Sequence, residues 1–295
     1  STPLYSSAAS DVYKRQRLNF RELNSRVNLA ANALLAAGIR KGEKMATVLP
    51  NCEELMLLYW AAAKTGIVIV PSSPLLQASG LATLLNDSDT VIVFADVSFI
   101  KMIEKMQDNL PEINKENWIL VGEINETCGF TRWTDFISGV SDEEPPDANL
   151  VDDDVYNIMY SSGTTGAPKG IVHTHYVRAN YCTQFASAWR MSPESVVLHA
   201  GAIVFNGAML DLMPWMYLGA TYILHQTFDP AEVLKTIFQE KVTHIVMVPS
   251  QIVALLNHPE FDPKKLSSLE MLQSVGAVSY THLRAHETRH DLVCR

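Results

Sequence analysis

Residues 160–170 read YSSGTTGAPKG, which places several small hydroxyl side chains, three glycines and one lysine within a short stretch. Glycines can adopt positive φ and let backbone N–H groups come close to an anion, while serine and threonine hydroxyls supply short hydrogen-bond donors. The lysine adds a positive charge, and Pro168 restricts the backbone just before it. The pattern therefore predicts a phosphate-binding loop. Its candidate residues are Ser161, Ser162, Gly163, Thr164, Thr165, Gly166, Lys169 and Gly170.

The spacing of this loop differs from that of two common nucleotide-binding motifs. It lacks the Gly-Lys-Ser/Thr ending of a Walker loop, and it lacks the GxGxxG spacing. A flexible Ser/Gly turn is the alternative that composition alone would favour. The flanking residues argue against that alternative, because 155–160 and 171–175 read as extended segments and 176–189 reads as a helix.

The loop resembles the phosphate-binding signature of the adenylate-forming (AMP-binding) enzymes, the family of acyl-CoA synthetases, firefly luciferase and peptide-synthetase adenylation domains. The resemblance implies an α/β fold: the large N-terminal domain of that family, with αβ-layered subdomains and mostly parallel sheets, here truncated at both ends. The alternation of strands and helices along the chain agrees with it. Helices are expected over 19–38, 51–64, 78–86, 99–107, 207–218, 230–240 and 250–257. Three of them are expected to have N-cap residues, namely Asn19, Asn51 and Ser250. Strands are expected over 44–49, 67–70, 90–95, 118–121, 221–225, 244–248 and 271–275.

Further segments resemble the same family. Residues 64–76 resemble a scaffold strand and turn, 228–256 resemble the part that leads to a pocket-lining helix, and 274–277 (SVGA) resemble the start of a turn beside adenine and the acyl group. Many members carry a histidine in an aromatic-His-x-x-Gly run, but the matching stretch here, AIVFNGAM at 202–209, has none. The resemblance implies five adenine- or acyl-site candidates: Phe205, Asn206, Gly207, Gly276 and Ala277. For Phe205, a position in the hydrophobic core is favoured over a role in the site.

The activity that the resemblance implies is that of an acid–thiol ligase. A carboxylic acid, expected to be fatty or otherwise lipophilic, would react with ATP to give an acyl-adenylate, and the acyl group would then pass to coenzyme A. ATP, Mg²⁺ and coenzyme A are the expected cosubstrates and cofactor. Two alternatives stay open: an adenylation domain that loads a carrier protein, and a non-catalytic nucleotide-binding fragment. The family's C-terminal catalytic lysine has no match in this sequence, so no catalytic residue is assigned and the chain alone is expected to be inactive.

Both ends of the chain read as translated sequencing adapters. Residues 6–16, SSAASDVYKRQ, match a transposase-type adapter, and 278–288, VSYTHLRAHET, match the opposite one. We therefore expect 1–16 and 278–295 to be artefacts and 17–277 to be a partial AMP-binding N-terminal domain. Within it, the acidic, proline-containing stretch 139–154 is expected to be a solvated connector, which is favoured over a metal-binding segment.

Composition limits the function classes. The chain has a formal net charge of −9 and no basic stripe, which argues against a nucleic-acid partner. Its scattered cysteines lack a CxxC motif and fit a reduced, cytoplasmic protein. No apolar run reaches the ~18 residues that span a bilayer, so the protein is expected to be soluble or at most peripheral. No metal site is expected, because His173 and His175, a possible zinc pair on a strand, lack a third ligand. The sequence does not predict the oligomeric state.

Overall fold

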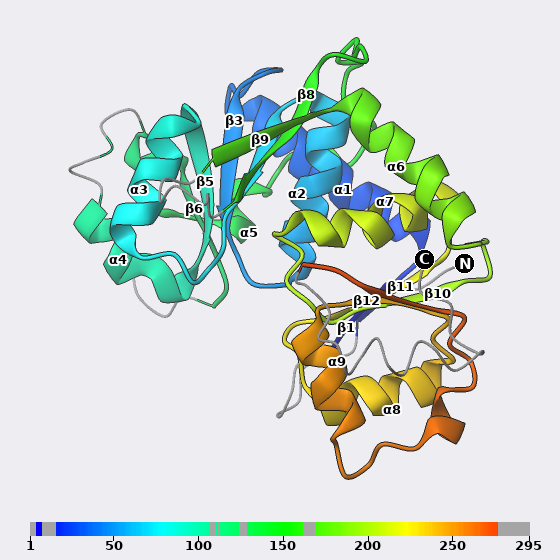
Figure 1. Cartoon of the computed structure of the whole chain (residues 1–295). Helices are drawn as coiled ribbons and strands as arrows, with labels where there is room; N and C mark the ends of the chain where they lie inside the picture. Colours follow the sequence, from blue (N-terminus) through cyan, green and yellow to red (C-terminus); the bar gives the residue numbers. More distant parts are fainter. Residues whose placement is uncertain are drawn as a thin grey trace. The chain divides into compact units, whose positions relative to one another are not determined.

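The computed structural model describes residues 4–7, 16–106, 110, 113–123, 129–161 and 169–276. The chain divides into two compact units, here named unit A (residues 20–180) and unit B (residues 1–19 and 181–295). Helix α6 (His175–Ala188) begins in unit A and ends in unit B (Figure 1). Each unit contains its own sheet, so the expected division into αβ-layered subdomains is confirmed.

Unit A is built on a sheet whose strand order is β7-β6-β5-β3-β4-β8-β9. Its pairs are parallel except for the antiparallel pair of β8 and β9. The strands are β3 (Lys44–Val48), β4 (Val68–Pro71), β5 (Thr90–Asp96), β6 (Trp118–Val121), β7 (Thr131–Arg132), β8 (Val155–Ser161) and β9 (Lys169–Thr174). The helices are α1 (Phe20–Ala36), α2 (Glu53–Thr65), α3 (Ala78–Asp87), α4 (Ile100–Met106) and α5 (Trp133–Phe136), with the 3₁₀ turns η1 (Val97–Phe99) and η3 (Lys115–Asn117).

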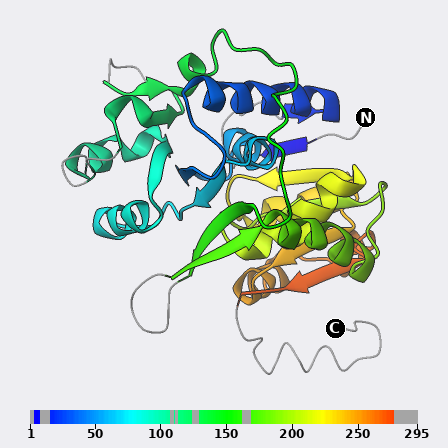
Figure 2. The same ribbon diagram turned by 90° about the horizontal axis from the view of Figure 1, so that it is seen from above.

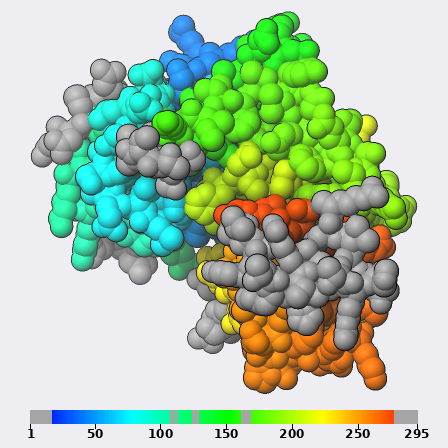
Figure 3. Space-filling view, viewed as in Figure 1, coloured from blue at the N-terminus to red at the C-terminus, as the bar shows by residue number. Residues whose placement is uncertain are grey.

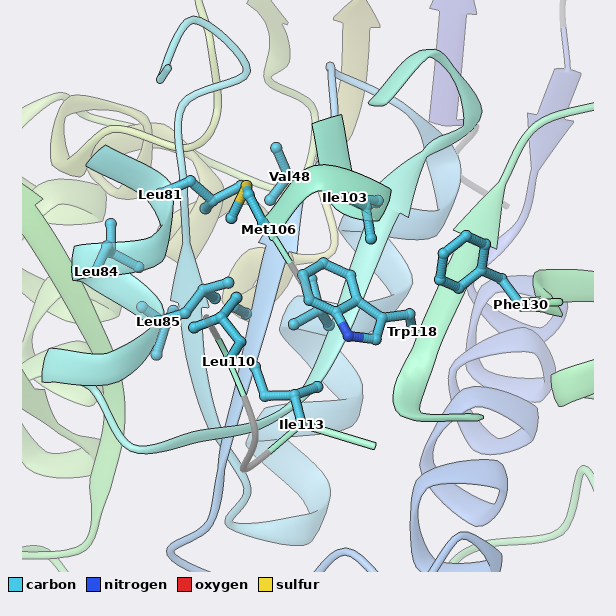
Figure 4. Close-up of a cluster of buried hydrophobic side chains, with 14 of the residues drawn as sticks. Val48, Leu81, Leu84, Leu85, Ile103, Met106, Leu110, Ile113, Trp118 and Phe130 are labelled. Carbon is cyan, nitrogen blue, oxygen red and sulfur yellow. The ribbon is translucent and has the colours of Figure 1, made fainter. Parts of the chain in front are cut away.

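Helices cover both faces of this sheet, as its nearly continuous apolar strands require. Trp118 of β6 lies in a buried cluster with Leu81 of α3 and Ile103 of α4 (Figure 4). Phe94 of β5 makes edge-to-face ring contacts with Trp133 and Phe136 of α5, with centroid distances of 5.9 and 5.4 Å. The other side of α3, in the cyan part of Figure 3, contributes to the protein surface.

The expected helices form close to their predicted bounds, but two predicted N-caps are wrong. The N-cap of helix α2 is Cys52, which has an extended backbone (φ −149°), so the predicted cap Asn51 lies one residue too early. Helix α9 (Pro249–Leu256) begins with a proline, which suits the first helical position and moves the cap to Val248. Ser250 therefore lies inside the helix, and the Val248 N–H donates instead to Gln251 Oε1 at 3.1 Å.

The predicted connector, residues 139–154, is held against α1 and α2, and we call it the strap. Asparagines one turn apart on α1 donate to it: Asn24 to Glu144 Oε1 (2.6 Å), Asn28 to the Asp142 carbonyl (2.8 Å), and Asn32 to the Ser141 and Glu143 carbonyls (2.8 and 2.9 Å). Lys64 of α2 donates to Asn24 Oδ1 and Asn28 Oδ1, both at 2.8 Å, and to Glu144 Oε2 at 2.5 Å. The acidic side chains stay mostly exposed, while side chains from both helices fix the backbone of the strap.

Unit B contains a sheet of order β13-β12-β10-β11-β1-β2, parallel except for the pair β1–β2. The strands are β1 (Leu4–Ser7), β2 (Gln16–Leu18), β10 (Val196–His199), β11 (Thr221–His225), β12 (His244–Met247) and β13 (Met271–Ser274). Helix α7 (Met209–Leu218), preceded by η4 (Asn206–Ala208), lies on one face, and α8 (Pro230–Glu240) and α9, followed by η5 (Pro263–Leu266), lie on the other (Figure 1). Leu198, Ile223 and Ile245 pack toward α8 and α9.

Two features of unit B bear on the predictions. Strand β10 was not expected from the sequence, because its four residues follow a loop and carry no alternation. Strand β1 lies between β11 and β2. The adapter origin of residues 1–16 stays a prediction, because a strand at 4–7 does not test where that sequence came from.

Candidate functional site

The predicted phosphate loop joins the two strands of the β8–β9 hairpin. Ser161 pairs with Lys169 and Tyr160 pairs with Gly170, so the hairpin closes directly at the base of the loop (Figure 2). The loop is therefore flanked by two strands, as predicted. The remaining candidates, Ser162, Gly163, Thr164, Thr165 and Gly166, lie outside the described residues, and their role stays a prediction.

Gly170 is required at the base of the loop by lack of space. Gly170 does not use the positive φ that glycine permits. A Cβ at this position would lie 2.9 Å from Ile158 Cγ2 and 3.1 Å from Tyr160 Cζ. The Tyr160 ring thus lies against the Gly170 backbone, and only glycine leaves room for it.

Tyr160 connects the hairpin to α3. Its hydroxyl donates to Asp87 Oδ2 at 2.5 Å. Burial, and after it the hydrogen bond to Asp87, raises the pKa of Tyr160 well above its usual range, so the phenol keeps its proton at neutral pH. Sequence analysis did not identify Asp87, because it is 73 residues away from its partner.

Lys169 begins β9 and is exposed, as is Gly170. Its neighbours Ile171 and Val172 are also about half exposed, because β9 is the edge strand of the sheet. The ammonium group is therefore accessible to an anion that approaches the end of the hairpin.

The adenine- and acyl-site candidates lie in unit B beside the carboxyl ends of its parallel strands. A Cβ at Gly207 would lie 3.2 Å from Val275 Cγ2, just after β13, and a Cβ at Gly276 would lie 3.3 Å from Val248 Cγ1, just after β12. Gly276 takes φ +82°, so it tolerates few other residues. Ligands of open parallel sheets bind at this edge, so the geometry suits a binding site. Ala277 lies outside the described residues.

Phe205 and Asn206 are both exposed, and Phe205 is 52% exposed. The core position that the sequence favoured for Phe205 is therefore wrong. It follows a turn whose two buried residues, Ile203 and Val204, anchor the backbone and leave the phenyl ring outside.

A buried polar cluster behind this edge was missed by sequence analysis. Asp211 of α7 is 0% exposed, and its Oδ2 lies 2.8 Å from His199 Nδ1 at the end of β10. The hydroxyl of Tyr222 of β11 lies 3.3 Å from Asp211 Oδ1. The available signal was one acidic residue in the otherwise uncharged helix MLDLMPWMYL.

The histidine pair considered for zinc does not lie on one strand. His173 is in β9, whereas His175 is the first residue of α6. Burial, and after it the nearby Arg178 guanidinium, lowers the pKa of His173 to about 4. Across the described ranges, no three His, Cys, Asp or Glu side chains come together as a metal site. Cys52 and Cys182 are free thiols whose pKa is raised by burial.

Among the residues that the structure describes, no helix has both the length and the apolar character that crossing a bilayer requires.

Comparison with known proteins gives one family. Residues 5–288 match the family described as AMP-binding enzyme. Among curated proteins, a feruloyl-CoA synthase of Amycolatopsis sp is 31% identical over 88% of this chain and 49% of its own length. The long-chain-fatty-acid–CoA ligase FadD13 of Mycobacterium tuberculosis is 29% identical over 87% of this chain and 48% of its own. The chain thus spans about half the length of these relatives.

Solved structures show the same fold. The anthranilate CoA ligase AuaEII, in complex with anthranoyl-AMP, superposes with a TM-score of 0.87 at 23% identity and covers 99% of this chain and 55% of its own. ATP-bound MatB from Rhodopseudomonas palustris gives a TM-score of 0.81 at 23% identity and covers 94% of this chain and 52% of its own.

Proposed function

Because the chain belongs to the AMP-binding enzyme family, we propose that it carries the ATP- and acid-binding part of an enzyme that activates a carboxylic acid and transfers it to coenzyme A. The acid is of the fatty or otherwise lipophilic class. The names of the relatives support the reaction class, since both the feruloyl-CoA synthase and FadD13 join an acid to coenzyme A.

The observation that supports this proposal most directly is the base of the β8–β9 hairpin. Gly170 keeps the backbone free of side-chain bulk, and Lys169 beside it is exposed. A lysine next to backbone N–H groups is a suitable partner for polyphosphate oxygens, because charge-assisted hydrogen bonds are stronger than neutral ones. Residues 161–166 would supply the remaining donors.

The reaction has two steps. A carboxylate oxygen attacks the α-phosphorus of ATP, the new O–P bond forms, and the bond from that phosphorus to the bridging oxygen breaks, so pyrophosphate leaves with its electron pair. A thiolate then attacks the acyl carbonyl and AMP leaves. Lys169 would act only in the first step, where it holds the β- and γ-phosphates and neutralises charge on the departing pyrophosphate.

Mg²⁺, when bound, would neutralise phosphate charge. The phosphates of ATP, together with water molecules, would supply ligands to it. This arrangement is ordinary for Mg²⁺, which rarely occupies an all-protein site.

A carrier protein is the alternative to coenzyme A as the thiol acceptor, and one relative supports it. A plipastatin synthase chain from Bacillus subtilis is 25% identical over 93% of this chain, although the match covers only 7% of its own length. We favour coenzyme A, because the feruloyl-CoA synthase and FadD13 match at higher identity, 31% and 29%. Replacing coenzyme A by a pantetheine-loaded carrier protein in the second step distinguishes the two.

The test is Lys169→Ala in the enzyme expressed from its complete gene. Loss of a charge-assisted contact worth about 1.5–3 kcal/mol predicts roughly a ten- to hundredfold slower adenylation. Thioester formation from a pre-made acyl-adenylate should stay near normal, because no pyrophosphate is held in that step. Lys235→Ala, in an exposed pair of α8, is the control. Normal adenylation in Lys169→Ala, or equal loss of both steps, would refute the proposed role.

A further inference from the structure

We propose that His199 is a specificity-determining residue, whose Nε2 accepts a hydrogen bond from a hydroxyl group on the acyl part of the substrate. The inference rests on the proposed function, because it concerns which acid that site accepts. It predicts an enzyme that prefers acids bearing a hydrogen-bond donor over their otherwise identical deoxy forms.

The burial of Asp211 is the first observation. This carboxylate has no exposed surface and lies in a helix whose other side chains are uncharged. Burying a charge is costly unless hydrogen bonds compensate it. His199 Nδ1 at 2.8 Å and the Tyr222 hydroxyl at 3.3 Å provide that compensation, one at each carboxylate oxygen.

The second step is the tautomer of His199. A carboxylate only accepts hydrogen bonds, so the proton between the two groups belongs to Nδ1. A neutral imidazole that is protonated at Nδ1 carries its free lone pair at Nε2. Asp211 thus fixes His199 as a donor toward the protein and an acceptor on its other side.

The third step is that this acceptor is buried and unused. Among the residues that the structure describes, Nε2 has no hydrogen-bond partner and essentially no exposed surface. Most buried polar atoms are paired, so an orphan requires a reason. Nε2 faces Gly201, because a Cβ built at Gly201 would lie 3.4 Å from it. Apart from Gly201 and its two chain neighbours, the only other described atom within 4 Å of that Cβ is Cε1 of the same ring.

The position of His199 in the sheet is the fourth observation. His199 is the last residue of β10, at the carboxyl edge where ligands of parallel sheets bind. Its strand neighbours are Leu224 of β11 and Val246 of β12, both apolar. Six residues later the chain reaches Phe205, the first of the acyl-site candidates. A hydroxyl on an acyl group bound at this edge would therefore meet Nε2 on a strand whose two neighbours carry apolar side chains at this level.

A purely structural role for the pair is the competing explanation. Replacing both partners of a buried hydrogen bond by apolar groups of similar shape can be nearly neutral for stability, whereas removing one partner leaves the other unsatisfied. The pair can therefore be replaced as a unit: His199→Leu with Asp211→Leu removes the acceptor without leaving a lone buried carboxylate. His199→Gln keeps an acceptor oxygen near the position of Nε2.

The experiment measures the affinity of this chain for acyl sulfamoyl adenosines, which mimic the acyl-adenylate. Two matched pairs are used: 4-hydroxycinnamoyl against cinnamoyl, and 8-hydroxyoctanoyl against octanoyl. In at least one pair, we expect the hydroxylated ligand to bind roughly tenfold or more tightly than its deoxy partner, because its hydroxyl satisfies a buried acceptor. The double variant should bind both members equally, and His199→Gln should keep part of the preference. Thermal melts establish that each variant is folded.

The outcomes separate the two proposals. Binding of neither member of either pair refutes the proposed function and the inference with it. Equal binding within both pairs by the unmodified protein overturns the inference alone. So does a hydroxyl preference that persists in the folded double variant. A ¹⁵N shift of His199 Nε2 on binding the hydroxylated ligand, without one for its deoxy partner, would report the contact directly.

Discussion

Replacing Gly170 by alanine is the sharpest test of the hairpin that carries the phosphate loop. The added Cβ would lie 2.9 Å from Ile158 Cγ2, which is attached almost directly to the backbone, and 3.1 Å from Cζ of Tyr160. The tyrosine ring is held in turn by its bond to Asp87, so it cannot rotate away freely. Overpacking of this kind costs about 1–3 kcal/mol. We expect that loss of stability together with roughly tenfold weaker MgATP binding, because Lys169 is the adjacent residue.

Gly80→Ala is the matched control. It is also a Gly-to-Ala change in unit A, but its Cβ would lie 3.6 Å from Leu76 Cδ2, an ordinary contact, and it lies in α3. Alanine favours helix, so this variant should gain up to about 1 kcal/mol. Urea denaturation and calorimetric titration with MgATP give both quantities. The reasoning fails if the two variants change stability in the same direction, or if Gly170→Ala binds MgATP normally.

Three further predictions concern stability. Lys64→Ala should cost about 1–3 kcal/mol, because it leaves the buried side-chain oxygen Oδ1 of Asn28 unsatisfied. Lys235→Ala, from an exposed pair, should cost about 0.5 kcal/mol or less, and similar losses in urea denaturation would contradict this. The hydrogen bond from Asn24, and after it the one from Lys64, lowers the pKa of Glu144 from its ordinary 4.5 to about 2. The stabilising effect of the Glu144 carboxylate is therefore complete above pH 4.5 and is lost as the pH falls toward 2. Glu144→Gln should weaken the acid dependence of the melting temperature between about pH 5 and 3, and an unchanged dependence would refute this role. Deleting residues 1–16 should shift the melting temperature by no more than about 2–4 °C if they are adapter-derived, and a larger drop would show that β1 is an integral strand.

Local patterns predicted the elements that depend on local chemistry. The helix predicted over 19–38 forms as α1 and buries Leu23, Val27 and Leu34, and the helix predicted over 230–240 forms as α8. Strand β10 was missed because its four residues offer no period. The order of strands within each sheet depends on long-range pairing, which a single sequence does not encode visibly.

The candidate site divides in the same way. The flanking strands of the loop follow from residues next to it, whereas the reason for Gly170 comes from Tyr160 across the hairpin, and Tyr160 depends on the distant Asp87. The strap shows the same limit. Its acidic composition predicts hydration, but the asparagines that hold it lie about 110–120 residues earlier in the chain.

The closure of the β8–β9 hairpin has a consequence for how this protein can be altered. Strand pairing already fixes both ends of the intervening segment, at Ser161 and Lys169, independently of what lies between them. The entropy of closing a loop grows only logarithmically, by about 0.6 kcal/mol for each doubling of its length. The segment is therefore an exchangeable cassette: loops of other lengths and compositions can be grafted between the same two residues while the sheet of unit A still forms. Ligand recognition can thus diverge, by evolution or by design, without a new solution to the folding problem.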